Sequence, residues 1–216
     1  MKNWLFGGIA TLVLAGTAAA QSDDRNINIG NFERLDAGGR FEIVFTPGDR
    51  PGLRFEGDAD DIDDIEYELN GGELEIRQNR RFFRWFGGDR RLDVTIHVTG
   101  PGVGSFHFSR GVDARLDGID SEELNLSAST GADVDAGGNC SYVDLNASTG
   151  AELDGRDLSC ANVDVNASTG ASVTVNATES LDANVSTGAD VRSLSRPANI
   201  SINTSTGGDV HMGSSH

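Results

Sequence analysis

The sequence predicts an all-β protein, a right-handed parallel β-helix (β-solenoid) with about 18–20 residues in each rung. Three observations support this fold class. A Ser-Thr-Gly triplet recurs at nearly constant spacing, apolar and polar residues alternate before each triplet, and Gly is abundant at 28 residues while aromatic residues make up only 6%. Such a composition favours short strands, tight turns and a narrow interior. The right hand follows from the general rule for parallel crossovers.

The first twenty residues have the pattern of a secretory signal peptide. Lys2 gives a basic start, residues 4–15 form an apolar run, and three alanines (residues 18–20) precede Gln21. This run is too short for a transmembrane anchor. No later stretch approaches the roughly 20 apolar residues that a spanning helix needs. We therefore expect export, removal of residues 1–20, and no transmembrane segment in the mature chain.

The chain is strongly acidic, with 34 Asp and Glu against 17 Lys and Arg and a net charge of −17. This charge disfavours nucleic acid and anionic membranes as partners and favours cations or basic partners. A second explanation is that the acidic residues only keep an exported β-protein soluble and its edge strands unpaired.

The N-terminal half of the mature chain, residues 27–104, is predicted to be rich in strands without a clear repeat. Gly- and Pro-containing turns separate the candidate strands. No linker divides this half from the repeat, so we expect one β-helix domain over residues 21–216, with irregular rungs first. The candidate strands are residues 32–35, 40–45, 53–56, 65–69, 73–76 and 92–98.

One segment of this half, residues 79–91, departs from the acidic pattern. Arginine beside aromatic residues suits the recognition of carboxylate, phosphate or sugar, or an anionic membrane face. Alternatively, the segment is a hairpin whose aromatic residues cover the solenoid while its arginines pair with nearby acids. The candidate ligand-binding residues are Arg80, Arg81, Phe82, Phe83, Arg84, Trp85, Phe86, Arg90 and Arg91.

Residues 58–64 contain five Asp residues and could supply oxygen ligands to Ca²⁺. The spacing matches neither an EF-hand nor the nonapeptide of calcium-binding β-rolls. Ile62 and Ile65 instead indicate a turn that leads into a strand. We expect no metal site and no cofactor.

The regular repeat occupies residues 105–212. Before each triplet, apolar residues alternate with polar ones, which is typical of a half-buried strand. After it, the Gly can adopt a positive φ and turn the chain into a second short strand. A degenerate copy starts at Ser109, and the full triplets start at Ser129, Ser148, Ser168, Ser186 and Ser205.

Stacked rungs turn equivalent positions into columns of side chains about 4.8 Å apart. One column holds Asn146, Asn166, Asn184 and Asn203, with Ser127 in the first rung. Asn ladders add amide hydrogen bonds along a stack, so we interpret this column as structural. An acidic column, interrupted by Ser172, is interpreted as a solvated face; it comprises Asp133, Glu152, Asp190 and Asp209.

The two cysteines follow the same spacing. Cys140 precedes Ser148 by eight residues, and Cys160 precedes Ser168 by eight. Adjacent rungs would place their Cα atoms about 5 Å apart, which a disulfide tolerates. Because export favours oxidation, we predict a Cys140–Cys160 disulfide.

No catalytic constellation stands out from the repeat. Carbohydrate-active β-helices need converging carboxylates or an acid with a basic partner, and no such set is separate from the columns. His97, His107, His211 and His216 lack a recognisable nucleophile nearby in the sequence. The Thr of each triplet forms one column, whereas a flat ice-binding face would need at least two. We predict that the protein is not an enzyme.

The order of motifs resembles the GIN-type head domain of putative autotransporter adhesins over about residues 27–212. The motifs are FERL at 32–35, FEIVF at 41–45, LRFEGD at 53–58, LEIR at 74–77 and LDVTIHV at 92–98, followed by the repeats. The resemblance implies one continuous right-handed β-helix on an exported bacterial protein, in the periplasm or at the cell surface. It implies no catalytic residue and no defined ligand.

From these observations we expect an adhesin-like or envelope-associated binding module whose partner is a protein or glycan of the cell envelope. Two alternatives stay open. They are a β-helical carbohydrate-active enzyme and a purely structural envelope protein.

Overall fold

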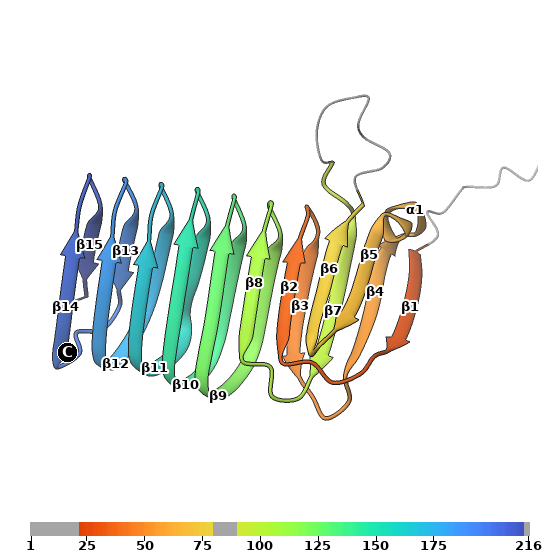
Figure 1. Cartoon of the computed structure of the whole chain (residues 1–216), viewed down its shortest axis with the longest axis horizontal. Helices are drawn as coiled ribbons and strands as arrows, with labels where there is room; N and C mark the ends of the chain where they lie inside the picture. Colours follow the sequence, from red (N-terminus) through yellow and green to blue (C-terminus); the bar gives the residue numbers. More distant parts are fainter. Residues whose placement is uncertain (1–21, 80–89, 214–216) are drawn as a thin grey trace, which may run out of the picture.

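The structure is a computed structural model and describes residues 22–79 and 90–213. Short rungs stack along one long axis, so the protein is a β-solenoid and the expected fold class is confirmed (Figure 1). The strands are β1 (Ser22–Asn28), β2 (Arg34–Gly38), β3 (Glu42–Pro47), β4 (Gly52–Asp58), β5 (Ile65–Asn70), β6 (Glu73–Gln78), β7 (Val94–Gly100), β8 (Ser105–Ser109), β9 (Asp113–Ser129), β10 (Asp133–Ser148), β11 (Glu152–Ala167), β12 (Ser172–Val185), β13 (Asp190–Ser193), β14 (Asn199–Thr204) and β15 (Asp209–Met212).

The long strands β9 to β12 bend around the stack and so belong to both of its broad faces. The start of β9 pairs with β3, whereas its end pairs with β8. We call the face made by β5, β6, β2, β8, the second halves of β9–β12 and β14 the amide face. The opposite face is made by β1, β4, β7, β3, the first halves of β9–β12, β13 and β15.

The rungs do not follow one another in chain order at the N-terminal end. Strand β2 pairs in parallel with β6 on one side and with β8 on the other. Strand β3 likewise lies between β7 and β9. The rung formed by β2 and β3 comes first in the sequence. It nevertheless lies inside the stack, between the rung of β6 and β7 and the rung of β8 and β9.

The continuous parallel winding expected for residues 27–104 is wrong at three strands. Strand β1 pairs antiparallel with β4, β4 pairs antiparallel with β7, and β5 pairs antiparallel with β6. A short helix, α1 (Ala59–Asp63), replaces the turn expected before β5. The side chain of Asp58 accepts a hydrogen bond from the N–H of Asp60 and so caps this helix. Of these three antiparallel pairs, only β5–β6 is a hairpin, because two residues, Gly71 and Gly72, join these strands.

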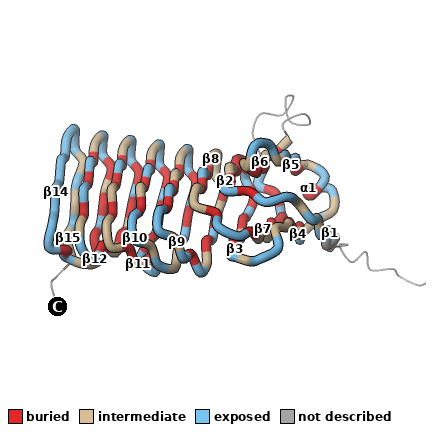
Figure 2. The backbone as a smooth tube through the Cα atoms, turned by 60° about the horizontal axis from the view of Figure 1, so that its bottom comes forward, coloured by how far each residue is buried: buried red, intermediate tan, exposed pale blue. Residues whose placement is uncertain are grey.

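The size of the side chains that fill the interior changes along the axis. The irregular rungs enclose fully buried Phe residues, and the rings of Phe45 and Phe106 meet edge to face at 4.9 Å. The rung with the degenerate triplet at Ser109 still buries Phe106 and Phe108, whereas the rungs with full triplets enclose mainly Val, Leu and Ala, as expected for a narrow interior. Buried and exposed residues alternate along both faces of the repeat (Figure 2). Within the described residues, no helix is both long and apolar enough to cross a membrane.

The Ser-Thr-Gly triplets form the corners between the two faces. Each Gly has a positive φ, as predicted, and so does the Thr before it, with φ between 49° and 55°. The N–H of Ala132 donates to the carbonyl of Ser129, which closes the turn. The N–H of Gly131 donates to the carbonyl of Thr149 in the next rung at 3.1 Å, and the same bond recurs at Gly150, Gly170 and Gly188. The corners are thus hydrogen-bonded to one another along the axis.

The predicted disulfide is confirmed. Cys140 and Cys160 are direct partners in the parallel register of β10 and β11, and a disulfide joins them across a Cα–Cα distance of 4.5 Å. The two cysteines are paired because both have the same position relative to their triplets.

Candidate functional site

The amide face carries three parallel columns of outward-facing polar side chains. The backbone register places each side chain beside its equivalent in the neighbouring rung. The first column holds Asp144, Asp164 and Asp182, the second holds Asn146, Asn166, Asn184 and Asn203, and the third holds Ser148, Ser168, Ser186 and Ser205.

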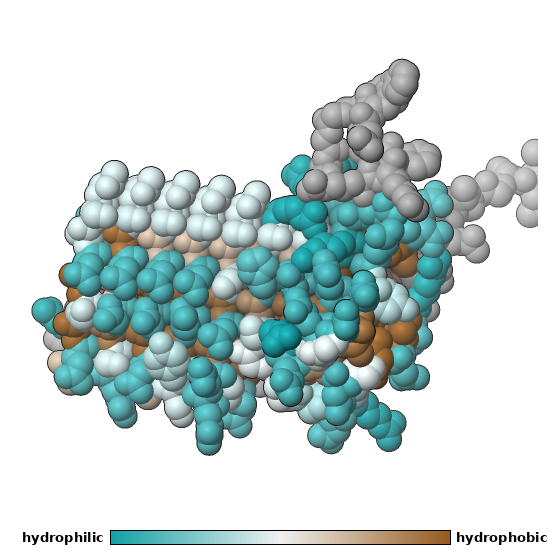
Figure 3. Space-filling view, viewed as in Figure 1, coloured by the Kyte–Doolittle hydropathy of each residue, from teal (hydrophilic) through white to brown (hydrophobic). Residues whose placement is uncertain are grey.

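A shallow groove of about 520 Å³ follows the second and third columns along the axis. The Asn and Ser side chains line it, and the chain segments at Ala147, Ala167 and Val185 lie between them. Figure 3 shows this furrow on the amide face, between a pale row along the corner edge and a hydrophilic row beside it. The groove is open and crosses several rungs. It therefore suits an extended polar chain better than a compact small molecule.

Hydrogen bonds orient the amides of the groove. Asn146 donates from Nδ2 to Oδ1 of Asp144 at 2.8 Å. Asn203 donates to Oδ1 of Asn184 at 3.2 Å, and Asn184 to Oδ1 of Asn166 at 3.4 Å. The Asn ladder inferred from the sequence is thus present, and its amides are held by the structure. They nevertheless stay exposed on the amide face.

The Asp column beside the groove places carboxylates in adjacent rungs. Partial burial, and then the neighbouring charges of Asp144 and Asp182, raise the pKa of Asp164 above its usual value of 3.8. The column places acidic side chains beside the groove, which disfavours anionic ligands.

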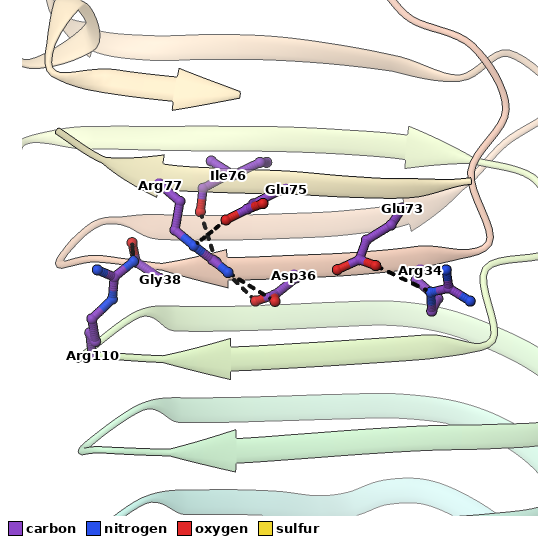
Figure 4. Close-up of polar contacts among 8 residues, drawn as sticks. All are labelled: Arg34, Asp36, Gly38, Glu73, Glu75, Ile76, Arg77 and Arg110. Carbon is purple, nitrogen blue, oxygen red and sulfur yellow. Dashed lines mark hydrogen bonds and ion pairs between the residues drawn. The ribbon is translucent and has the colours of Figure 1, made fainter. Parts of the chain in front are cut away.

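Toward the N-terminal end the same register continues into a charged cluster (Figure 4). His107 lies between Ser127 and Asp36 in the column that contains the Asn ladder. Arg77 forms ion pairs with Asp36 at 2.9 Å and with Glu75 at 2.7 Å. The hydrogen bond to Asp36 raises the pKa of Arg77. The polar, largely uncharged groove therefore ends at a network of ion pairs.

Arg110 occupies the space above a glycine at this boundary. Its guanidinium donates to the carbonyl of Gly38 at 2.8 Å, and a Cβ on Gly38 would lie 2.5 Å from the Arg110 side chain. Arg110 replaces the Thr of the other triplets and shares their positive φ. The degenerate triplet at Ser109 thus joins the repeat to the charged cluster.

The opposite face is also acidic but holds a different arrangement. Asp133, Glu152, Asp190 and Asp209 occupy one register column with Ser172 between them, as predicted. Partial burial, followed by the charges of neighbouring acids, raises the pKa of Asp133. Beside this column, Arg156 pairs with Asp154, and Arg115 pairs with Asp117.

Most of the arginine- and aromatic-rich candidate site lies outside the described residues. This applies to Arg80, Arg81, Phe82, Phe83, Arg84, Trp85 and Phe86. The two described members pair with acids: Arg90 pairs with Asp61, and Arg91 with Asp113. At these two positions the contacts match the alternative in which the arginines of the segment pair with local acids.

Asp61 is the acid that the sequence reasoning did not single out. Its side chain is 5% exposed; it accepts hydrogen bonds from Arg90 and, at 2.8 Å, from the N–H of Asp93. The hydrogen bond from Arg90 lowers its pKa below the usual 3.8. In the described part of the chain, no group of three or more His, Cys, Asp or Glu residues is arranged to hold a metal ion.

The described histidines are dispersed over the molecule. His97 lies 3.3 Å from Glu56, His211 lies 3.0 Å from Asp190, and His107 lies at the end of the groove. His216 lies outside the described residues. The groove itself was missed at the sequence level, because the Asn column was interpreted as structural. The signal that could have found it was the coincidence of two uncharged polar columns, Asn and Ser, on one face.

Comparisons with known proteins agree with this architecture. The family model described as "Putative auto-transporter adhesin, head GIN domain" matches residues 31–197. A crystal structure of a putative adhesin from Bacteroides fragilis is similar with a TM-score of 0.72 and 17% identity, covering 90% of this chain and 98% of that one. A putative adhesin from Parabacteroides merdae gives a TM-score of 0.50 and 11% identity, covering 89% and 96%. At these identities the two structures show a shared fold alone. No curated protein matches the chain.

Proposed function

The chain belongs to the family of head GIN domains of putative auto-transporter adhesins, and from this premise we propose that it is an exported, non-catalytic binding module of the cell envelope. The polar groove on the amide face is the observation that supports this proposal. A row of equivalent Asn and Ser side chains offers many similar weak contacts in series. This arrangement suits adhesion to a repetitive surface.

We propose that the ligand is a neutral glycan chain rather than a protein. Asn amides and Ser hydroxyls both donate and accept hydrogen bonds, which matches the hydroxyl groups of sugars. The adjacent Asp column and the net charge of −17 disfavour acidic polysaccharides and nucleic acid. The lining of the groove contains no Phe, Tyr or Trp, the residues in which the centre of a tight protein interface is enriched.

Export is part of the proposal. It is supported by the signal-peptide pattern of residues 1–20 and by the disulfide, which forms and persists in oxidising compartments. The mature chain would then act in the periplasm or at the cell surface.

The proposal is tested by glycan-array binding of the mature chain, followed by titration with the best neutral oligosaccharide. Replacing Asn166 and Asn184 with Ala removes two amides from the middle of the groove. Because each lost hydrogen bond costs about 1 kcal/mol, we expect affinity to fall by roughly tenfold or more. The matched control replaces Glu152 and Ser172 with Ala on the opposite face and should bind as the wild type does.

Deleting residues 80–89 forms a separate arm of the same experiment. We propose that this arginine- and aromatic-rich segment makes, at most, an additional contact. If the deletion abolishes binding while the groove variant leaves it unchanged, the groove proposal is wrong and the segment is the site. Turnover of the bound glycan by the wild type would contradict a non-catalytic role.

A further inference from the structure

The C-terminal end of the solenoid exposes apolar side chains that every earlier repeat rung buries. Ile200 and Ile202 continue the inward columns of Leu181 and Ala183. Leu181 and Ala183 are 1% and 0% exposed, whereas Ile200 and Ile202 are 40% and 41% exposed. Val210 and Met212 of β15 are only partly buried against the core. The last rung therefore ends the core without covering it.

The same rung leaves two strand edges open. Among the described residues, β14 pairs only with β12, and β15 pairs only with β13. The sequence of β14 is Asn-Ile-Ser-Ile-Asn-Thr and contains no charge. Natural edge strands are usually protected by charged residues, proline or a covering segment, because an open edge can pair with another chain. The last rung has apolar inward residues and an uncharged edge on the amide face.

The N-terminal end of the stack is different. Helix α1 contacts β1, β4 and β5 there, and its own Ile62 is buried. The outer strand of the amide face at this end, β5, carries Glu66 and Glu68 on its exposed surface. Head-to-tail stacking of two copies would bring the uncharged β14 edge against this acidic β5 edge. Head-to-tail association is therefore disfavoured.

We propose that two copies of this chain associate tail to tail through their C-terminal rungs. A two-fold axis through the stack end pairs β14 with β14 and β15 with β15 of the second copy, each antiparallel. Opposed residues must point to the same face. A register centred on Val210 meets this condition and places Asp209 of one copy opposite His211 of the other, while β14 contributes no charge. The symmetry is closed, so the product is a dimer rather than a fibre.

This pairing has two physical consequences. The inward columns that end at Ile200 and Ile202 become buried against those of the second copy, which extends both cores. The amide faces lie on the same side of the dimer, so both grooves are open to the same side. Only β14 and β15, of six and four residues, would meet in each copy, so we expect a small interface and association in the micromolar range or weaker.

Sedimentation velocity of the mature wild-type chain over a concentration series tests the proposal. We expect a shift from monomer to dimer that stops at dimer. Ile202→Lys places a charge where the second copy would bury it and should weaken association by about tenfold or more. Tyr67→Lys is the matched control, because Tyr67 is similarly exposed, at 42%, on a strand at the other end. It should leave association unchanged.

Hydrogen exchange of the wild type gives a readout that does not depend on a variant folding. Raising the concentration should slow exchange at the amides of β14 and β15 and leave those of β1 and β5 unchanged. A monomer at every concentration would overturn the proposal, and so would equal weakening by both variants or growth beyond the dimer.

Discussion

Asp61 is a buried carboxylate. Hydrogen bonds from Arg90 and from the N–H of Asp93 stabilise its charged form. We expect Asp61→Asn to lower the free energy of unfolding by about 1–3 kcal/mol at neutral pH, because the charge-assisted hydrogen bonds are lost. The pKa of Asp61 is lower in the folded state than its usual 3.8. Its contribution is therefore complete above that value and is lost as the pH falls through the folded pKa.

Urea unfolding of both proteins at pH 7 and at a series of acid pH values checks this prediction. The difference between wild type and variant should shrink only below the usual value of 3.8. Asp63→Asn is the control, since Asp63 lies in the same helix but is 67% exposed in a single pair with Arg25. An Asp63 effect as large as that of Asp61 would contradict the argument from burial.

Ionisation of Asp164 has the opposite effect on stability from ionisation of Asp61. Its pKa is raised by partial burial and by Asp144 and Asp182, so its ionised form destabilises the fold. Protonation favours the folded state, and stability from this group falls as the pH rises through the raised pKa. We expect Asp164→Asn to stabilise the protein at neutral pH by about 0.2–1 kcal/mol, which is the range for like charges in adjacent strands.

Thermal or urea unfolding at pH 7 measures the gain, which should disappear at acid pH. Asp154→Asn on the opposite face supplies a contrast. Arg156 lowers the pKa of Asp154, so that variant should lose stability. Stabilisation by both changes would indicate a general effect of net charge rather than repulsion within one column.

At the corners of the solenoid, the residue type is unfavourable for the backbone conformation that it adopts. Thr149 has φ 55°, a left-handed conformation that β-branched residues rarely adopt, whereas Asn tolerates it. We expect Thr149→Asn to raise the free energy of unfolding by about 1 kcal/mol. The turn keeps its hydrogen bond from Ala151 N–H to Ser148.

Urea midpoints of wild type, Thr149→Asn and Thr149→Val check this prediction. The Val variant keeps the branched Cβ and should bring no gain. Equal stability of the Asn variant and the wild type would show that the Thr side chain makes a compensating contact at the corner.

At the scale of the whole molecule, the repeat could be predicted from sequence and the N-terminal rungs only in part. Each repeat rung has the same positions relative to its triplet, so the register, the Asn ladder and the Cys140–Cys160 disulfide all follow from one alignment. The strands of residues 27–104 have no such marker. Strands β2 to β7 could be predicted from alternation, whereas β1 was missed. Nothing local specifies that the β2–β3 rung lies between later ones or that β1, β4 and β5 pair antiparallel.

The groove could not be predicted for a related reason. Sequence spacing shows which residues share a column, but the depth between two columns depends on the corner geometry and on the small side chains beneath. Asn146 and Ser148 were recognisable as outward residues; that they border a hollow is a property of the assembled stack.

The solenoid architecture also predicts how the disulfide acts on the molecule. Each rung contacts only its neighbours, so stability is close to a sum of nearest-neighbour terms. The bond closes a 20-residue separation between β10 and β11, and on the chain-entropy model it contributes about 3 kcal/mol.

We expect the double variant Cys140→Ser, Cys160→Ser to unfold at lower urea concentration. Relative to the wild type, native-state hydrogen exchange in this variant should become faster at the amides of β10 and β11 and stay unchanged at those of β2 and β3, which pair with neither β10 nor β11. Dithiothreitol should lower the wild-type midpoint and leave the double variant unchanged. An equal loss of protection in β2 and β3 would mean that the stack unfolds as one unit instead of rung by rung.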